Sequence, residues 1–215
     1  RLEDAGDVSG EFRWLLVSEG FYGTGDVWLN GKRLGKVDGQ YLGFTFDVTN
    51  VLREGGENLI GVRLTNRCAS YVLPGLKMPD FLLYGGLSGR MWLERVPAVR
   101  IDAGATRVEG REQAAGRWDV RIDSVLTGAL TEGDALSWRV LDADGGEVGG
   151  RGSFGDPTDC TTLSVDAPRL WDVDDPCLYV AEGTLSCDGA IVDVVSIRFG
   201  FRSAEFRPHE GFFLN

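Results

Sequence analysis

The chain has 215 residues, of which 43% are hydrophobic, and its formal net charge is -11 at pH 7. This length accommodates one or two domains, and the acidic balance without a cluster of Lys and Arg excludes a nucleic-acid binder, which needs a basic face to release counterions from phosphates. No run of about 18 apolar residues occurs, so the sequence predicts no membrane-spanning helix and no membrane partner.

A hairpin is the clearest element in the first half of the chain. Val27–Leu29 runs into Asn30 and Gly31, and the chain returns through residues 33–34. Asn followed by Gly supplies the two positive-φ positions of a type I′ turn, whose twist matches that of the flanking strands. We therefore predict two antiparallel strands joined at Asn30 and Gly31.

Short strands continue to Pro97, where we place a domain boundary. Strands are predicted over Phe44–Val48, over residues 57–65 with Ile60, Val62 and Leu64 on one face, and over Met91–Val96. Residues 49–52 predict one short helical turn, capped by Asp47 or Thr49. Residues 67–89 hold two prolines and several aromatics without a clear strand, and long loops of this kind are often functional.

The second half of the chain also consists of short predicted strands separated by turns. Strands are predicted over Trp118–Ile122, Leu136–Leu141, Leu178–Ser186 and Ile191–Phe199, with turns at Asp144-Gly145 and Asp188-Gly189. Helical periodicity is almost absent throughout, and about 100 residues with several short strands fit an immunoglobulin-like sandwich. The fold class is therefore all-β.

The cysteines and the single histidine predict neither a metal site nor a cofactor. The four cysteines, Cys68, Cys160, Cys177 and Cys187, form no C-x-x-C pair, and we expect free thiols. Cys177 and Cys187 lie at opposite ends of one predicted strand, roughly 30 Å apart, which is too far for a disulfide. The G-x-G-x-x-G match over residues 150–155 lacks a following helix, so we interpret it as a glycine-rich loop rather than a dinucleotide site.

Acidic clusters have ordinary structural interpretations as well. Asp142-x-Asp144-Gly145 lacks the further ligands of a calcium loop and is interpreted as a turn. Asp172, Asp174 and Asp175 precede Pro176 in a polar turn, where solvation leaves carboxylates untuned for glycoside hydrolysis. His209 and Glu210 have no nucleophile with a supporting motif, and we expect a surface loop there.

The tryptophans are expected in the core. Trp28, Trp92, Trp118, Trp138 and Trp171 alternate with polar neighbours or adjoin turns. Aromatic side chains stack on sugars in some proteins, but in sandwiches they more often fill the interior.

Several stretches taken in order resemble glycoside hydrolase family 2, which includes β-galactosidases, β-glucuronidases and β-mannosidases. The matching segments are residues 27–35 around Trp28-Leu29-Asn30-Gly31, residues 39–49, residues 56–66, Asp80-Phe81 through Gly85-Gly86-Leu87, Leu170-Trp171 through Leu178-Tyr179, and Phe199-Gly200-Phe201-Arg202 through Glu205-Phe206 and 211–215. Ser88-Gly89-Arg90 departs from the aromatic, Arg, Asp or Asn order usual after Gly-Gly-Leu. The arginine contact made there in the family is therefore in question.

The resemblance implies a galactose-binding-like jelly-roll sandwich over residues 1–97 and an immunoglobulin-like sandwich over residues 98–203. Residues 204–215 would be a linker towards a (β/α)8 barrel that carries both catalytic glutamates in the family. Such a barrel needs about 250 residues of alternating strand and helix, and this pattern is absent. We therefore expect no catalytic residue in this chain.

One residue of the chain is implied in substrate contact. In the family, the aspartate of the D-F-x-x-x-G-G motif reaches the barrel mouth and binds hydroxyls of the terminal sugar, and Asp80 occupies that position. A carboxylate accepts bidentate hydrogen bonds from vicinal hydroxyls. The alternative is that Asp80 only caps a turn.

The resulting hypothesis is that the chain is the non-catalytic N-terminal part of a retaining exo-β-glycosidase. A β-galactosidase is preferred to a β-glucuronidase or a β-mannosidase. Its partner is a carbohydrate substrate reached through the barrel, it needs no cofactor, and a homo-oligomer is possible because relatives often assemble. The alternatives are a free-standing carbohydrate-binding module and an adhesive surface protein built from immunoglobulin-like units. The opening residues lack a signal-peptide pattern, but Arg rather than Met comes first, so we expect a processed or cut chain. Its location stays open, with the cytoplasm favoured.

Overall fold

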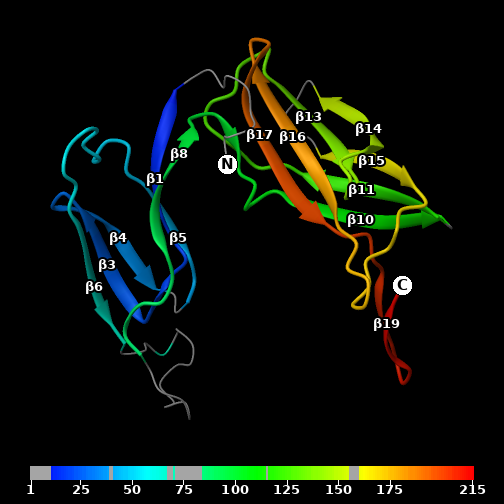
Figure 1. Ribbon diagram of the computed structural model, residues 1–215, viewed down its shortest axis with the longest axis horizontal. Coiled ribbons are helices and arrows are strands. Elements are labelled where there is room, and N and C mark those ends of the chain that lie inside the picture. The colour runs from blue at the N-terminus through cyan, green and yellow to red at the C-terminus, as the bar shows by residue number, and fades with distance from the viewer. Residues whose placement is uncertain (1–10, 39–40, 67–69, 71–83, 115, 155–159) are drawn as a thin grey trace. The chain divides into compact units, whose positions relative to one another are not determined.

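The computed structural model describes residues 11–38, 41–66, 70, 84–114, 116–154 and 160–215. Every regular element among these residues is a strand, as the sequence predicts. The chain divides into two compact units, over residues 12–96 and from residue 97 onward (Figure 1). Each unit holds its own core between its own sheets.

The first unit contains eight strands. They are β1 (Phe12–Ser18), β2 (Phe21–Tyr22), β3 (Thr24–Leu29), β4 (Lys32–Asp38), β5 (Phe44–Asp47), β6 (Ile60–Thr65), β7 (Gly86–Leu87) and β8 (Met91–Pro97). One sheet has the order β5-β1-β8, a second has the order β4-β3-β6, and β2 pairs with β7. β1 pairs with β5, β2 pairs with β7, and β3 pairs with both β4 and β6, each in the antiparallel direction.

Alternation along β3 explains how this core forms. Val27 and Leu29 are fully buried, whereas Asp26 and Trp28 between and beside them are half-buried on the opposite face. Successive side chains of a strand point to opposite faces, so the two apolar residues reach the interior together. There they join Leu16 and Val48 in one cluster.

Turn chemistry fixes the predicted hairpin. Asn30 and Gly31 have φ angles of 51° and 82°, the left-handed values of a type I′ turn. The Asn30 side chain also donates from Nδ2 to the Val51 carbonyl at 2.9 Å and accepts from Leu59 N–H at 3.0 Å. The hairpin turn is thus tied to the segment before β6.

The short helical turn predicted after β5 is present as well. Leu52 N–H donates to the Val48 carbonyl at 2.8 Å, and the Asp47 carboxylate accepts from Thr49 N–H at 2.9 Å. Of the two candidate capping residues, Asp47 therefore performs the role.

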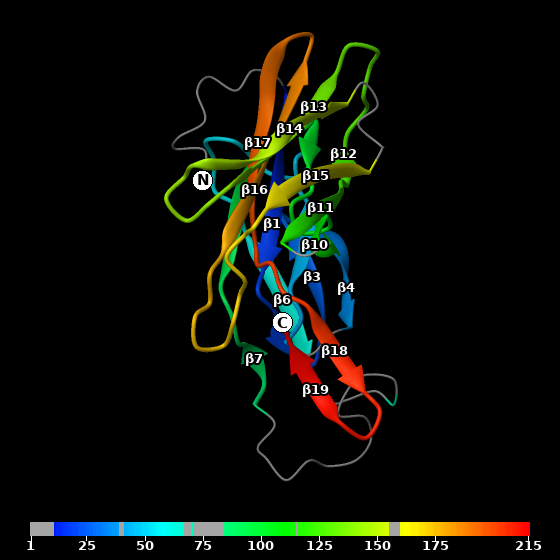
Figure 2. The same cartoon turned by 90° about the vertical axis from the view of Figure 1, so that its right-hand side faces the viewer.

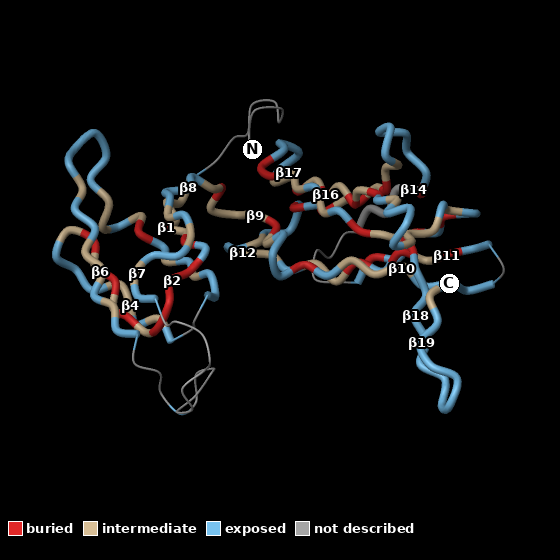
Figure 3. Tube along the Cα trace, turned by 60° about the horizontal axis from the view of Figure 1, so that its bottom comes forward, coloured by how far each residue is buried: buried red, intermediate tan, exposed pale blue. Residues whose placement is uncertain are grey.

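The second unit contains the remaining strands. They are β9 (Arg100–Ile101), β10 (Arg107–Ala114), β11 (Arg117–Asp123), β12 (Leu126–Thr127), β13 (Ala135–Leu141), β14 (Glu147–Phe154), β15 (Thr161–Asp166), β16 (Tyr179–Cys187), β17 (Ala190–Phe199), β18 (Ala204–Arg207) and β19 (Gly211–Leu214). The two main sheets have the orders β10-β11-β15 and β14-β13-β16-β17, and they enclose one core to give a sandwich. Figure 3 shows the buried residues along the facing strands of this unit.

Tryptophans and glycines are matched across that core. Trp138 is 1% exposed, its ring lies over Gly183 of the neighbouring strand, and a Cβ added at Gly183 would come within 2.7 Å of the ring. Trp118 is 3% exposed and packs edge-on against Phe201. The core prediction is therefore confirmed for these two tryptophans.

The same prediction is wrong for Trp92, which is 39% exposed. It lies on β8, an edge strand, and the Arg90 guanidinium carbon is 5.9 Å from its ring centroid. Trp28 and Trp171 are only half-buried. An amphipathic indole covered by a guanidinium on an outer sheet face tolerates this exposure.

One other expectation needs correction. Residues 150–154, interpreted as part of a glycine-rich loop, belong to β14, and residues 152–154 pair with β13. Backbone pairing with a neighbouring strand here overrides a local composition that favours irregular structure. Residues 204–214, within the expected linker, form the hairpin β18–β19. The described cysteines, Cys160, Cys177 and Cys187, are free thiols, and burial above all raises the pKa of Cys187 to about 11.

A buried carboxylate joins β17 to β9 in the second unit. Asp193 is 7% exposed, and its Oδ2 accepts from Ile101 N–H at 2.8 Å. Burial raises the pKa of Asp193 despite the backbone hydrogen bonds that it accepts. Because its pKa in the folded state exceeds that in the unfolded state, Asp193 stabilises the fold at low pH, and this contribution is lost as pH rises through the folded pKa.

Replacing Asp193 with Asn removes this titration while keeping an oxygen acceptor. We expect the stability of Asp193→Asn relative to the parent chain to improve as pH rises from about 3 to 7, because the parent pays the cost of burying a charge over that range. Urea unfolding at several pH values measures this. Asp123→Asn is the control with the opposite sign, since the Arg121 hydrogen bond lowers the pKa of Asp123. A flat difference for Asp193→Asn would contradict the interpretation.

Candidate functional site

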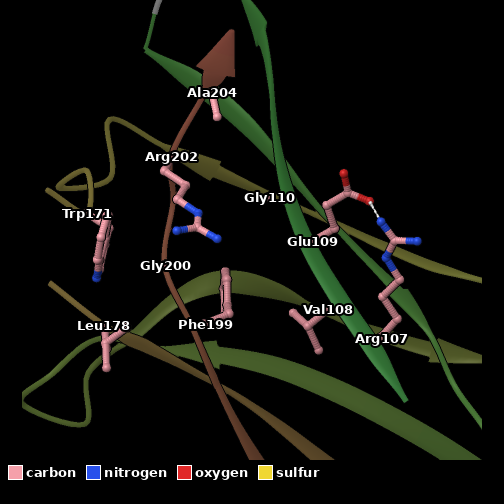
Figure 4. Close-up of a pocket in the computed structure, with 10 residues that line it drawn as sticks. All are labelled: Arg107, Val108, Glu109, Gly110, Trp171, Leu178, Phe199, Gly200, Arg202 and Ala204. Atoms are coloured by element: carbon pink, nitrogen blue, oxygen red, sulfur yellow. Dashed lines mark ion pairs between the residues drawn. The ribbon is translucent and has the colours of Figure 1, made fainter. Parts of the chain in front are cut away.

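A polar pocket of about 630 Å³ opens in the second unit. Its lining, drawn in Figure 4, consists of Arg107, Val108, Glu109, Gly110, Trp171, Leu178, Phe199, Gly200, Arg202 and Ala204. β10 is the edge strand of one sheet and β17 is the edge strand of the other. The pocket therefore lies where β10 and the segment that follows β17 pass each other without pairing.

Trp171 forms one wall of the pocket and is held through its backbone. Its N–H donates to the Phe201 carbonyl at 2.7 Å, and its carbonyl accepts from Asn215 Nδ2 at 3.0 Å. Gly200 allows this close approach, because a Cβ there would lie 2.9 Å from the Trp171 Cβ. The indole is thus fixed at a wall rather than packed fully inside.

The opposite wall is charged. Arg111 donates to the Glu109 carboxylate at 3.1 Å, and Arg107 lies 3.2 Å from the same oxygen. The Arg111 hydrogen bond is the main cause that lowers the pKa of Glu109, with the charge of Arg107 adding to it. Glu109 therefore stays a carboxylate and can accept hydrogen bonds from a ligand hydroxyl.

Arg202 occupies the space between these walls. In Figure 4 its guanidinium points between Trp171 and Glu109. The guanidinium carbon lies 5.1 Å from the Trp171 ring centroid, within the range of a cation–π contact. No carboxylate of the described residues forms an ion pair with Arg202.

An aromatic hairpin follows the pocket in the chain. Phe206 of β18 is 81% exposed, Phe212 of β19 is 55% exposed, and their ring centroids lie 5.0 Å apart. Phe213 lies under the Arg207 guanidinium, 4.1 Å from its carbon. The hairpin projects from the sheets of its own unit (Figures 1 and 2). Groups of exposed apolar side chains are typical of interaction surfaces.

The predicted substrate residue Asp80 lies outside the described residues, as does Cys68. β6 ends at Thr65, and β7, which pairs with β2, is the next strand among the described residues. Arg90, at the step where the family's arginine contact is in question, pairs within the first unit. Arg90 donates from Nε and Nη2 to Glu19 Oε1 at 2.9 and 2.6 Å. Here Arg90 joins the start of β8 to the turn after β1.

The other sequence candidates are structural. Asp142 Oδ1 accepts from the N–H groups of Asp144 and Gly146, as expected of a turn. Asp175 accepts from Arg169, and Asp172 Oδ1 accepts from Asp174 N–H at 3.1 Å, as expected of a polar turn.

His209 has a φ of 67° at the tip of the terminal hairpin. In the part of the chain that the structure describes, no group of three His, Cys, Asp or Glu side chains could hold a metal ion. No helix there is long and apolar enough to cross a membrane.

The sequence does not predict the pocket or the aromatic hairpin. It predicts Trp171 in the core and identifies Arg202 only as part of a motif. A usable signal was the pair Gly200 and Arg202 around a buried Phe201, because alternation then predicts that the glycine and the arginine share the outer face.

Taken together, the described residues define an all-β protein of two sandwich units with a polar pocket and an aromatic hairpin in the second. Residues 101–202 match the family "Glycosyl hydrolases family 2". Residues 3–72 match a second family model, "Glycosyl hydrolase 2 galactose-binding domain-like". The chain belongs to glycoside hydrolase family 2.

Similar proteins include both β-glucuronidases and β-galactosidases. A β-glucuronidase of Bacteroides fragilis is 27% identical over 94% of this chain and 31% of its own length. A β-galactosidase of Thermoanaerobacter pseudethanolicus is 25% identical over 92% of this chain and 27% of its own length. The chain thus spans about a quarter to a third of the length of these relatives.

Solved structures carry the same fold. The FMN-binding β-glucuronidase from Facaelibacterium prausnitzii L2-6 superposes with a TM-score of 0.86 at 24% identity, over 97% of this chain and 32% of that one. A family 2 member from Bacteroides cellulosilyticus DSM 14838 gives a TM-score of 0.79 at 26% identity, over 95% of this chain and 28% of that one.

Proposed function

We propose that this chain is the non-catalytic N-terminal part of a retaining exo-β-glycosidase that hydrolyses terminal β-linked sugars. The observation that carries the proposal is the exposed aromatic hairpin, which gives the second unit a surface for a further domain. The match to only part of each relative supports the same view. A barrel of about 250 residues would fit within the unmatched length of such relatives.

The two units would support that barrel and shape its pocket. We assign residues 1–97 to a jelly-roll domain, residues 98–203 to an immunoglobulin-like domain, and residues 204–215 to the connection with the barrel. Asp80 would reach the barrel mouth and accept hydrogen bonds from hydroxyls of the terminal sugar. β-Galactosides are the first substrates to test, and β-glucuronides are the second because relatives of both kinds occur.

The test compares this chain with the longer polypeptide that contains it. We expect the longer protein to release nitrophenol from a β-galactoside or a β-glucuronide, and this chain alone to release none, because retaining hydrolysis needs two positioned carboxylates. In the longer protein, Asp80→Asn should lower kcat/KM by about 10- to 100-fold through loss of a charge-assisted contact.

Asp102→Asn provides a matched control, because Asp102 caps a turn of the second unit by accepting from Gly104 N–H. It should leave kcat/KM within about twofold, as a surface substitution away from the site does. Sugar release by this chain alone would contradict the non-catalytic role, and an unchanged kcat/KM in Asp80→Asn would remove Asp80 from the substrate site.

A further inference from the structure

Two donor side chains in the lining of this pocket, Arg202 and Trp171, have side-chain N–H groups without an acceptor among the described residues. Arg202 contacts the Trp171 ring but forms no ion pair with the described carboxylates. The indole N–H of Trp171 also has no hydrogen-bond acceptor among the described residues. Unpaired donors on residues that line a pocket are available to a ligand that brings its own acceptors.

The charge of the lining selects the sign of that ligand. Although the whole chain has a formal net charge of -11, two arginines line this pocket against one glutamate. Glu109 is already engaged by Arg107 and by Arg111. Arg202 is left as the open cation, and a guanidinium binds a carboxylate or a sulfate through paired N–H groups.

The other residues of the lining indicate which uncharged groups the ligand carries. Trp171 offers a flat apolar wall that is fixed by backbone hydrogen bonds on both sides. Glu109 offers carboxylate oxygens, and four consecutive residues of the edge strand β10 line the pocket and bring backbone polar groups to it. A sugar ring uses all three features, since its apolar C–H face packs on indole and its hydroxyls bond to polar groups.

We propose that this pocket binds an acidic saccharide. Its carboxylate or sulfate pairs with Arg202, its ring lies against Trp171, and its hydroxyls bond to Glu109 and the edge of β10. The volume of about 630 Å³ lies within the usual range of small-molecule sites. The site lies in the second unit, and its proposed ligand does not depend on the proposed function.

Calorimetric titration of this chain tests the proposal with four probes: D-glucuronate, D-glucose 6-sulfate, D-glucose and acetate. We expect the two acidic sugars to bind with a Kd of about 1 mM, and D-glucose and acetate to bind at least about tenfold more weakly. Comparison of the two acidic sugars distinguishes a carboxylate from a sulfate as the preferred anion. In nuclear magnetic resonance, the indole N–H signal of Trp171 should shift on addition of D-glucuronate.

Arg202→Gln should weaken binding of both acidic sugars by about tenfold or more, because the paired charge-assisted contact is lost. Arg198→Gln is the matched control: Arg198 is exposed on β17 but does not line the pocket, and its replacement should leave both affinities unchanged. Thermal unfolding checks that each variant is folded, and the Trp171 signal in the parent chain needs no variant.

Three results would overturn the proposal. One is the absence of acidic-sugar binding by the parent chain together with an unmoved Trp171 signal. Another is equal binding of D-glucose or acetate, which would mean a neutral sugar site or a simple anion site. The third is an unchanged affinity in Arg202→Gln. Because no step measures hydrolysis, failure here leaves the test of the proposed function independent.

Discussion

Trp138→Ala should lower the free energy of unfolding of the second unit by about 3 to 5 kcal/mol, the usual cost of emptying a buried aromatic position. Trp138 is 1% exposed, and its ring covers Gly183, which has no side chain to fill the space left behind. The substitution also leaves Ser124 Oγ without the indole N–H that donates to it at 3.0 Å. Since domains are stable by only about 5 to 15 kcal/mol, the unit should come close to unfolding at room temperature.

Urea unfolding followed by circular dichroism measures this loss, with Trp92→Ala as the matched control. Trp92 is 39% exposed and contacts Arg90 from an edge strand, so its removal should cost only about 0.5 to 1 kcal/mol. Equal losses in the two variants would mean that Gly183 and its neighbours close over the space, and that the ring is not a supporting element of the sandwich.

Local chemistry explains which parts of the fold could be predicted from the sequence. Asn30-Gly31 and Asp188-Gly189 each combine residues that accept positive φ, and both pairs form the expected hairpin turns. Period-two alternation likewise identifies β11 and β13 because one face of each is buried. These signals need no knowledge of distant residues.

The strands that escaped prediction form through backbone pairing with a neighbouring strand, which their own composition does not indicate. β14 is rich in glycine and forms a strand because β13 pairs with it. The turn between β18 and β19 places His209, rather than Gly or Asn, at positive φ, so the usual hairpin signal is missing. The local composition of these segments favours loops, so it does not predict these strands.

The sequence also does not predict the pocket, because the pocket depends on how two sheets are placed. Glu109 and Arg202 are almost a hundred positions apart, and they face one space only because the free edges of two sheets pass each other. Alternation predicts which side chains point outward, but it does not predict which outward faces meet. Trp171 is predicted in the core because aromatic residues of sandwiches more often fill the interior than line a pocket.

The terminal hairpin is where the proposed architecture has its largest measurable consequence. In the longer polypeptide, Phe206→Ser combined with Phe212→Ser should weaken the association of the second unit with the further domain by about 3 to 6 kcal/mol, the value of burying two phenylalanine side chains. In this chain alone both rings are largely exposed, so the same double variant should change stability by only about 0.5 to 1 kcal/mol, through loss of the ring pair. Thermal unfolding and limited proteolysis of both proteins measure the contrast, and Leu59→Ser, at a position that is 74% exposed in the first unit, is the control. Similar small effects in both proteins would mean that the rings stay in solvent, and the second unit would then need another surface to hold the barrel.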